Sequence, residues 1–374
     1  MKKKVLIFID SLQCGGAEKS LVTLLKHFNL DSYMIELLML KKGGDFEKFL
    51  PPAIKVNYVN MNLSVFSRVH YKILRLTNYR SINNAQLLWM CISNKVAPHK
   101  GSYDVAIGWG QGFATYYVAE KVRANKKLAW INTDYEKAGF VWKYDKSIYN
   151  KISTIVAVSD YVNTLIKPLA GQNKVITIPN IVDKVDVLNL AASGLAEELE
   201  TNIFNIVTVA RLEKPKNLKL AIEATRILKN KGCIFHWYLI GEGSERDSLE
   251  KEIVDSKLEA YMTLLGYREN PYPYIKKSDL YVQTSEFEGL GRTLIEASIL
   301  NKPIVTTNFP SAYGIVIDKV TGFIVNMTGE EIAMAIYILQ KDKGKMEDFI
   351  ANSKNKITNN PNDIVKLIEK ILDE

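Results

Sequence analysis

Two glutamates flank a glycine-containing turn in the second half of the chain. Glu288 follows a predicted strand over residues 280–284, and Glu296 lies inside the helix that the apolar spacing predicts after the turn. At ~1.5 Å of rise per helical residue, the two carboxylates lie up to ~12 Å apart. Between them, N–H groups at the helix start can bind phosphates or sugar hydroxyls. This spacing suits the two ends of an extended nucleotide sugar, although a loop glutamate plus a solvated helix glutamate is the simpler alternative.

Two cations follow another predicted strand, over residues 205–209. Arg211 and Lys216 are five positions apart across a turn that contains Pro215. A diphosphate leaving group needs such cations, because negative charge develops on it as its bond to the sugar breaks. The alternative is a pair of exposed basic residues in an ordinary strand-to-helix loop.

Together these segments resemble family 4 of the retaining, nucleotide-sugar-dependent glycosyltransferases, which have the GT-B fold. The first segment is similar to that family's Glu-x7-Glu motif. The resemblance implies that Glu288 lies beside the donor sugar and that Glu296 binds the ribose. It also implies that backbone amides between them bind sugar hydroxyls, at Gly289, Leu290, Gly291 and Arg292. Leu290 stands where the family usually has Phe, a change that affects packing more than chemistry.

The cation segment resembles the family pattern Gly-Arg-Leu-x-x-x-Lys-Gly. Arg211 and Lys216 keep their interval, whereas Ala210 and Asn217 replace the flanking glycines. The resemblance implies that the two cations stabilise the departing diphosphate.

Four further residues match the family in chain order. Gly241 follows a predicted strand over residues 235–240 and permits close approach of the backbone to a ligand. Tyr267 and Arg268 follow the predicted strand 262–265, where the family's main chain reads the nucleobase. Gly16 belongs to a Gly-Gly turn at a helix start and would face the donor diphosphate, although a plain turn explains this pair equally well.

Asn132 departs from the family in a way that bears on the chemistry. Related bacterial enzymes commonly carry histidine at this position, turned toward the donor sugar. Asparagine can still donate a hydrogen bond to a sugar hydroxyl, but it cannot titrate. The four histidines of this chain occupy no obvious substitute position. We therefore predict that no histidine acts as an acid or a base. Front-face attack assisted by the leaving phosphate does not require one.

Composition indicates a globular chain of two domains. The 374 residues exceed one ordinary core, and 47% are hydrophobic without a run of ~18 apolar residues. We expect no signal peptide, because the lysines at the start lead directly into a strand. Three widely separated cysteines (Cys14, Cys91 and Cys233) favour a reducing cytoplasm over disulfides or a zinc site. No Asp-x-Asp occurs, so we predict no metal and no cofactor beyond the donor substrate.

Strands alternate with helices along the whole length, which is typical of parallel α/β units. We predict further strands at residues 5–9, 34–38, 54–59, 104–108, 128–131, 155–158 and 175–178. The predicted architecture is two Rossmann-like domains facing each other across a cleft. Residues 1–183 form the acceptor domain, residues 184–201 a linker, and residues 202–374 the nucleotide-sugar domain. The last helix is allowed to pack back on the first domain.

Charge is divided unevenly between the two halves. Residues 1–183 hold 25 Lys and Arg against 13 Asp and Glu, a net +12; the remainder holds 24 against 28, a net −4, giving +8 overall. Residues 48–103 contain no acid at all. Within them, residues 65–80 read as a basic amphipathic helix, with Arg68, Lys72, Arg75 and Tyr79 on one stripe and Val69, Ile73 and Leu76 on another.

Such helices lie on anionic membranes. The alternative is a helix that packs on the protein by its apolar side and exposes its basic side. Nucleic acid is disfavoured, because no recognition motif accompanies the charge.

We therefore predict a metal-independent retaining glycosyltransferase on the cytoplasmic face of the inner membrane. It would move a sugar, UDP-linked on family frequency, to a lipid-linked glycan acceptor in bacterial surface polysaccharide or capsule synthesis. Two alternatives stay open: a catalytically weak carbohydrate-binding partner subunit, which Asn132 permits, and a nucleotide-sugar epimerase of GT-B-like fold. A Rossmann dinucleotide enzyme is disfavoured, since Gly15 and Gly16 lack the third glycine of its fingerprint.

Overall fold

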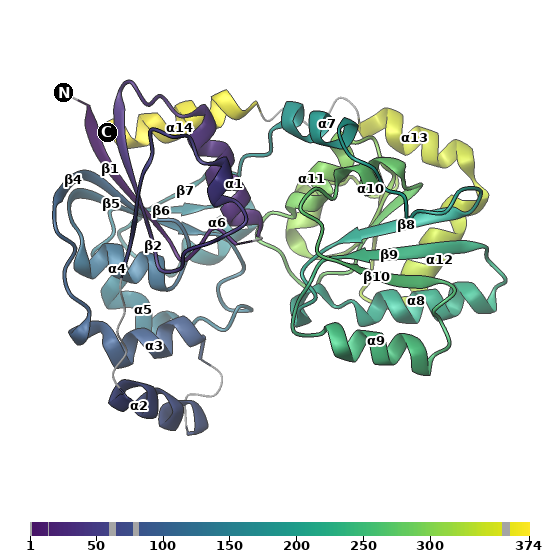
Figure 1. Cartoon of the computed structure of the whole chain (residues 1–374), viewed down its shortest axis with the longest axis horizontal. Helices are drawn as coiled ribbons and strands as arrows, with labels where there is room; N and C mark the ends of the chain where they lie inside the picture. The colour runs from purple at the N-terminus through teal and green to yellow at the C-terminus, as the bar shows by residue number, and fades with distance from the viewer. Residues whose placement is uncertain (1, 14, 60–64, 78–81, 354–359) are drawn as a thin grey trace. The chain divides into compact units, whose positions relative to one another are not determined.

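The computed structural model describes residues 2–13, 15–59, 65–77, 82–353 and 360–374. Cys14 and Tyr79, which entered the sequence predictions, lie outside these ranges. Contacts divide the chain into two units, the first comprising Met1–Ile181 with Pro361–Glu374 and the second Val182–Asn360 (Figure 1).

Unit 1 is built on a parallel sheet with the strand order β3-β2-β1-β4-β5-β6-β7. Its apolar strands are buried along most of their length, as a parallel sheet covered on both faces requires. The strands are β1 (Lys3–Ile9), β2 (Tyr33–Met39), β3 (Lys55–Tyr58), β4 (Ser102–Gly108), β5 (Arg123–Ile131), β6 (Thr154–Ala157) and β7 (Lys174–Thr177).

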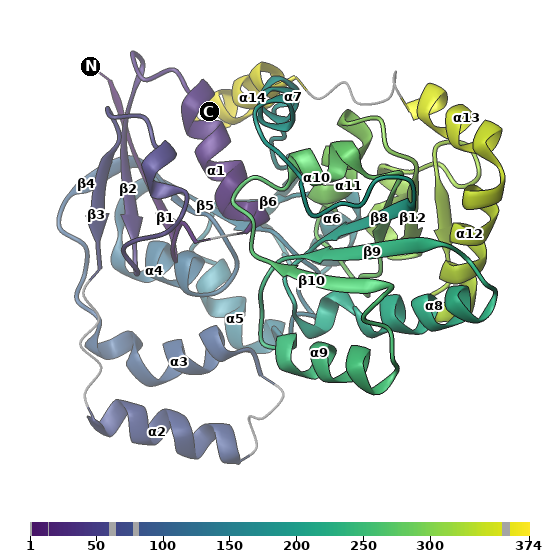
Figure 2. The ribbon, with the colours of Figure 1, turned by 45° about the vertical axis from the view of Figure 1, so that its right-hand side comes forward.

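The helices of unit 1 form successive layers. They are α1 (Gly16–His27), α2 (Val65–Leu76), α3 (Asn84–Ile92), α4 (Phe113–Lys121), α5 (Trp142–Tyr149), α6 (Asp160–Ile166) and the C-terminal α14 (Pro361–Asp373). Helix α4 lies on β1, β4 and β5, α3 lies on α4, and α2 lies on α3 (Figures 1 and 2). Helix α14 packs on α1, and Lys3 and Lys126 donate to its last carbonyls, at Leu372 and Ile371.

Unit 2 repeats this design with the strand order β10-β9-β8-β11-β12-β13, again all parallel. The strands are β8 (Phe204–Val209), β9 (Phe235–Ile240), β10 (Met262–Gly266), β11 (Leu280–Gln283), β12 (Ile304–Thr307) and β13 (Phe323–Val325). The helices are α7 (Lys184–Ala192), α8 (Lys219–Asn230), α9 (Arg246–Asp255), α10 (Tyr272–Lys277), α11 (Arg292–Ile299), α12 (Gly329–Lys341) and α13 (Lys343–Ser353).

Neighbouring strand residues of unit 2 face two different hydrophobic clusters. Ile206 packs with α8, α9, α12 and α13, whereas Val207 packs with α7, α10 and α11. Leu280 and Tyr281 divide in the same way. The alternation follows from the two-residue period of a strand and places helices on both faces of the sheet.

The prediction of two parallel α/β units is confirmed, with some differences in detail. Strands β12 and β13 were not among the predicted ones. The stretch 184–201, which we expected to connect the units, contains α7, and its Val187, Ala191 and Leu199 enter the core of unit 2. No helix in the described part of the chain combines the length and apolar character needed to cross a membrane.

Both sheets reverse their strand order at one point. The reversal lies between β1 and β4 in unit 1 and between β8 and β11 in unit 2. In doubly wound sheets, ligands bind beside the carboxyl ends of the strands at such a point. The loops after β8 and β11 therefore define the candidate site of unit 2, and they carry Arg211, Lys216 and Glu288.

Candidate active site

Glu288 is held by three donors, one at the end of β11 and the others in the loops after β8 and β11. Its Oε1 atom accepts hydrogen bonds from Gln283 Nε2 and Ser285 Oγ, both at 2.8 Å, and it pairs with the ammonium of Lys216. The side chains of Lys216 and Glu288 are 17% and 16% exposed, so the ion pair is partly shielded from water. The structure thus brings together two residues that the sequence placed in loops after separate strands.

Backbone contacts fix the two loops to each other. Thr284 Oγ1 donates to the carbonyl of Lys216 at 2.8 Å, and the amide of Glu286 donates to the carbonyl of Pro215 at 2.9 Å. Asn217 adopts a left-handed φ of 47°. Asparagine tolerates this conformation better than most residues, which explains how the turn forms here without a glycine.

Arg211 is an available cation on the loop after β8 that also carries Lys216. Its side chain is exposed, and among the described residues it has no hydrogen-bonding or ionic partner. The backbone beneath it is tightly packed, since a Cβ on Gly241 would lie 1.8 Å from the carbonyl oxygen of Ala210. Gly241 also has a φ of 147°, so both geometry and space require glycine there. Arg211 is therefore a free positive charge on a well-defined loop.

Sequence reasoning missed the residues that orient Glu288. Thr293 Oγ1 donates to Gln283 Oε1 at 2.9 Å, which turns the Gln283 amide so that its Nε2 faces the glutamate. Ser311 Oγ donates to the carbonyl of Glu288 at 3.1 Å. The run Gln283-Thr284-Ser285 could have indicated them, because polar residues at the buried end of a strand need partners.

Glu296 lies inside unit 2 rather than on its surface. The residue is 3% exposed, and its Oε1 accepts from Tyr272 OH at 2.8 Å and Arg292 Nε at 2.9 Å. Burial and the Glu296 carboxylate raise the pKa of Tyr272, which keeps the phenol protonated as a donor. A ribose hydroxyl would therefore meet a carboxylate that two protein groups already orient.

The glycine turn between the glutamates is compact. Gly289 and Gly291 are buried, and Leu290 packs on the cluster that α11 shares with α10. Gly291 precedes α11 with a φ of 83°, a conformation suited to glycine. Helix α11 ends shortly before Asn301, which has a φ of 54° and whose amide donates to the carbonyl of Ser298.

The predicted nucleobase position has side chains engaged within unit 2. Arg268 donates from Nη2 to Glu198 Oε1 at 2.8 Å and from Nε to Tyr274 OH at 3.0 Å. The Arg268 guanidinium holds the pKa of Glu198 below its usual value. A pocket of about 540 Å³ adjoins this group, lined by Leu195, Glu197, Glu198 and Tyr274. Recognition of a nucleobase at this position would therefore depend on the main chain of Tyr267 and Arg268.

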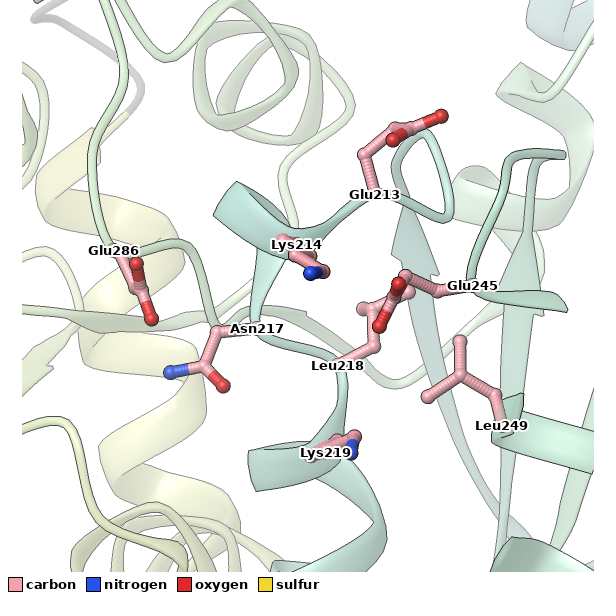
Figure 3. A pocket seen from close by; sticks show the side chains of 8 residues that line it. All are labelled: Glu213, Lys214, Asn217, Leu218, Lys219, Glu245, Leu249 and Glu286. Carbon is pink, nitrogen blue, oxygen red and sulfur yellow. The ribbon is translucent and has the colours of Figure 1, made fainter. Parts of the chain in front are cut away.

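A second pocket, of about 260 Å³, lies beside the Lys216 loop. It is lined by Glu213, Lys214, Asn217, Leu218, Lys219, Glu245, Leu249 and Glu286 (Figure 3). None of the predicted site residues is among these described lining residues. Across the described ranges, no group of three or more His, Cys, Asp or Glu side chains is arranged to hold a metal ion.

In unit 1, Asn132 belongs to a directed chain of neutral hydrogen bonds. The amide of Ile181 donates to Ser20 Oγ at 3.0 Å, so the Ser20 hydroxyl donates onward to Asn180 Oδ1 at 3.1 Å. Asn180 Nδ2 then donates to Asn132 Oδ1 at 3.1 Å. Within the described chain, Asn132 Nδ2 is left without a partner. The network therefore orients Asn132 as a donor, as a contact to a sugar hydroxyl would require.

The surroundings of Asn132 include the loop after β4. Gln111 Oε1 accepts from the Asn132 backbone amide at 2.9 Å, and a Cβ on Gly110 would lie 4.0 Å from Asn132 Nδ2. Gly16 is exposed at the start of α1, after the extended Gly15. Both predicted residues of unit 1 thus lie at the carboxyl edge of its sheet.

Comparison with known proteins finds a family model that matches most of unit 2. Residues 196–356 match the family model described as "Glycosyl transferases group 1". This match lies within unit 2 and covers less than half of the chain.

Two curated bacterial proteins show how far the similarity extends. The poly(ribitol-phosphate) alpha-N-acetylglucosaminyltransferase of Staphylococcus aureus (strain COL) is 25% identical over 69% of this chain and 51% of its own. The UDP-Gal:alpha-D-GlcNAc-diphosphoundecaprenol alpha-1,3-galactosyltransferase of Escherichia coli is 27% identical over 54% of this chain and 53% of its own. The chain spans between 22% and 51% of the length of the first curated relatives that it matches.

A solved structure matches the whole chain. HepE from Anabaena, determined in complex with UDP and glucose, has a TM-score of 0.75 and 19% sequence identity over 100% of both chains. This likeness identifies the architecture as the GT-B type, as the sequence predicted.

Proposed function

We propose that the chain is a retaining glycosyltransferase of family 4 that moves a sugar from a nucleotide sugar to a glycan acceptor. The observation that carries this proposal is the grouping after β8 and β11, where the exposed Arg211 lies on the same loop as the Lys216–Glu288 pair. The family match to residues 196–356 supports the reaction class.

In the proposed reaction, the bond between the sugar C1 and the diphosphate oxygen breaks as the acceptor oxygen bonds to C1 on the same face. The acceptor proton passes to the departing diphosphate. Arg211 and Lys216 stabilise the charge that develops on this leaving group. Glu288, oriented by Gln283 and Ser285, lies beside the donor sugar, and Glu296 orients the ribose. Asn132 contributes a neutral donor to a sugar hydroxyl.

The proposed donor is a UDP-sugar and the proposed acceptor is a lipid-linked glycan of bacterial surface polysaccharide synthesis. Support for the donor comes from HepE, whose structure contains UDP and glucose. Support for the acceptor comes from the Escherichia coli relative, whose name specifies a diphosphoundecaprenol acceptor. We place the enzyme on the cytoplasmic face of the inner membrane, which the net +12 of residues 1–183 would favour electrostatically.

A thermal-shift panel of UDP, GDP and their sugars tests the donor assignment. A ligand at 100 times its dissociation constant adds ~2.7 kcal/mol to stability, so the true donor should raise the melting temperature. Turnover of the stabilising nucleotide sugar, labelled in the sugar, then separates a transferase from a weak carbohydrate-binding subunit. Stabilisation by NAD instead of a nucleotide sugar would contradict the proposal.

We also propose that the reaction needs no metal, because Arg211 and Lys216 supply the positive charge that a divalent ion would otherwise provide. Excess EDTA should leave the rate within about twofold of its starting value, whereas removal of an essential metal would abolish charge stabilisation worth several kcal/mol. Loss of activity on chelation, restored by manganese, would refute metal independence while leaving the donor assignment intact.

A further inference from the structure

Helix α2 of unit 1 directs its apolar face away from the protein. Phe66, Val69, Ile73 and Leu76 are 73%, 48%, 53% and 69% exposed. Their spacing of three, four and three residues places them on one stripe of the helix. The sequence offered an ordinary alternative in which this apolar side packs on the protein. The structure reverses that arrangement.

The opposite face of α2 is the one that contacts unit 1. Ser67 is 2% exposed, and its hydroxyl accepts from Lys95 Nζ at 2.8 Å. Tyr71 OH donates to Asn84 Oδ1 at 3.0 Å, and Arg75 Nη1 donates to the carbonyl of Ile82 at 2.8 Å. Polar contacts therefore attach α2 to the unit, and the attachment leaves its apolar stripe outward.

The position of α2 makes this stripe peripheral within unit 1. Helix α2 lies on α3, which lies on α4, so two helices separate it from the sheet (Figures 1 and 2). An apolar stripe that contributes to no core of its own unit is characteristic of an interaction surface.

Charge around the stripe indicates the kind of partner. Arg68 and Lys72 are exposed on one side of it, and His70 is exposed on the other. Residues 48–103, which include α2 and α3, contain no Asp or Glu. An apolar stripe bordered by two cations and by no described acidic side chain of α2 fits an anionic lipid surface, where cations contact headgroups and apolar side chains enter the acyl boundary.

We propose that α2 is an interfacial membrane helix whose stripe of Phe66, Val69, Ile73 and Leu76 inserts into an anionic bilayer. Arg68 and Lys72 contact the lipid headgroups. Arg75 is excluded from this role because it already bonds to Ile82 within unit 1. The inference deepens the proposed membrane location but does not depend on the proposed reaction.

Insertion and simple charge attraction respond differently to salt. At about 1 M salt the Debye length falls to ~3 Å, so attraction by Arg68 and Lys72 is screened. Burial of apolar side chains is not screened in this way. The full chain should therefore bind phosphatidylglycerol–phosphatidylcholine vesicles at low salt and retain a measurable fraction of that binding at high salt.

Three variants of the full chain separate the contributions in a vesicle cosedimentation assay. Changing the four stripe residues to Gln, which favours helix, should weaken partitioning at least roughly tenfold at both salt concentrations. Arg68→Gln with Lys72→Gln should weaken it roughly 30-fold at low salt only. The matched control is Lys251→Gln with Val254→Gln on the exposed face of α9 in unit 2, which should bind like wild type.

Each contrary outcome is informative. Equal binding by wild type and the stripe variant, or no binding by wild type at low salt, would overturn the inference. A wild-type dimer in sedimentation velocity that the stripe variant abolishes would overturn it in favour of a second copy as the occupant. UDP-dependent thermal shifts should be the same in all variants, so loss of vesicle binding alone leaves the proposed reaction standing.

Discussion

The strand-end loops of the two units differ in the kind of hydrogen bond that orients their candidate residues. In unit 2, Glu288 is held by an ammonium and two neutral donors. In unit 1, Asn132 is held by the neutral chain through Asn180 and Ser20. Hydrogen bonds to ionised groups are roughly twice as strong as neutral ones. We therefore expect the charged residues in the unit 2 loops to have the larger effect on the turnover rate. The neutral hydrogen-bond network of unit 1 should mainly set the orientation of Asn132.

The comparison with known proteins divides the units in the same way. The family model matches only residues 196–356, all within unit 2. Neutralising a departing diphosphate leaves few choices of side chain, whereas a sugar hydroxyl can be met by many neutral donors. Under the proposed function, this difference would allow a neutral donor such as Asn132 to contact the sugar.

The largest effect is expected at the free cation. Arg211→Ala should lower turnover by ~10²-fold or more, because it removes a group that stabilises charge mainly in the transition state. Steady-state kinetics with the nucleotide sugar identified in the thermal-shift panel provides the measurement.

Lys216→Ala should be comparably slow but also less stable, since Glu288 loses its ionic partner. Lys219→Ala is the matched control, because Lys219 is an exposed cation three positions further along. If Arg211→Ala and Lys216→Ala both turn over at near-normal rates, the positive charges of the unit 2 loop do not contribute to catalysis.

The two glutamates should separate catalysis from binding. Glu288→Gln should lower the catalytic rate by roughly 10- to 100-fold, because the amide cannot match a carboxylate beside the donor sugar. Glu296→Gln should instead weaken nucleotide affinity by roughly 10- to 100-fold, the usual value of a hydrogen bond to a charged group. Calorimetry with the nucleotide and turnover measurements distinguish the two.

Tyr272→Phe provides the control for the buried carboxylate. It removes one donor to Glu296 while keeping the charge, and it should cost less affinity than Glu296→Gln. If both glutamate variants lose nucleotide affinity equally, the assignment of separate roles to the two ends of the motif is incorrect.

The sequence predicted those features that depend on local pattern. Apolar runs located β1 through β11, and the local patterns placed Lys216 and Glu288 in loops that each follow a strand. It did not predict Gln283 and Ser285, because polar residues there also mark an ordinary strand end. The sequence did not predict helix α7, because few of its residues enter the core. Val187 and Ala191 are two that do.

Helix α2 shows a different limit. Periodicity identified its apolar stripe, but periodicity cannot say whether a stripe faces the protein or solvent. That direction is set by Tyr71 and Arg75, whose partners Asn84 and Ile82 lie at the start of α3 and on the segment that leads into it. Such pairings between neighbouring elements require the three-dimensional structure.

The smallest effect is expected in the neutral hydrogen-bond network of unit 1, where one substitution can replace the side-chain donor of Asn180 with an acceptor. Asn180→Asp keeps an acceptor for Ser20 but presents an oxygen to Asn132 Oδ1 in place of a donor. Asn132 should then turn its Nδ2 toward the introduced carboxylate and lose the donor orientation proposed for the sugar. We expect kcat/KM to fall by roughly three- to tenfold, the value of one neutral hydrogen bond, with little change in melting temperature.

A double-mutant cycle decides whether the effect passes through Asn132. In an Asn132→Ala background, Asn180→Asp should cost nothing further, because the group that it reorients is gone. Asn163→Ala is the control, since it removes a neutral bond of unit 1 to Thr177 away from this network and should leave kcat/KM unchanged. Additive losses in the cycle would mean that Asn180 acts independently of Asn132, and the orientation of that amide would then have no part in the reaction.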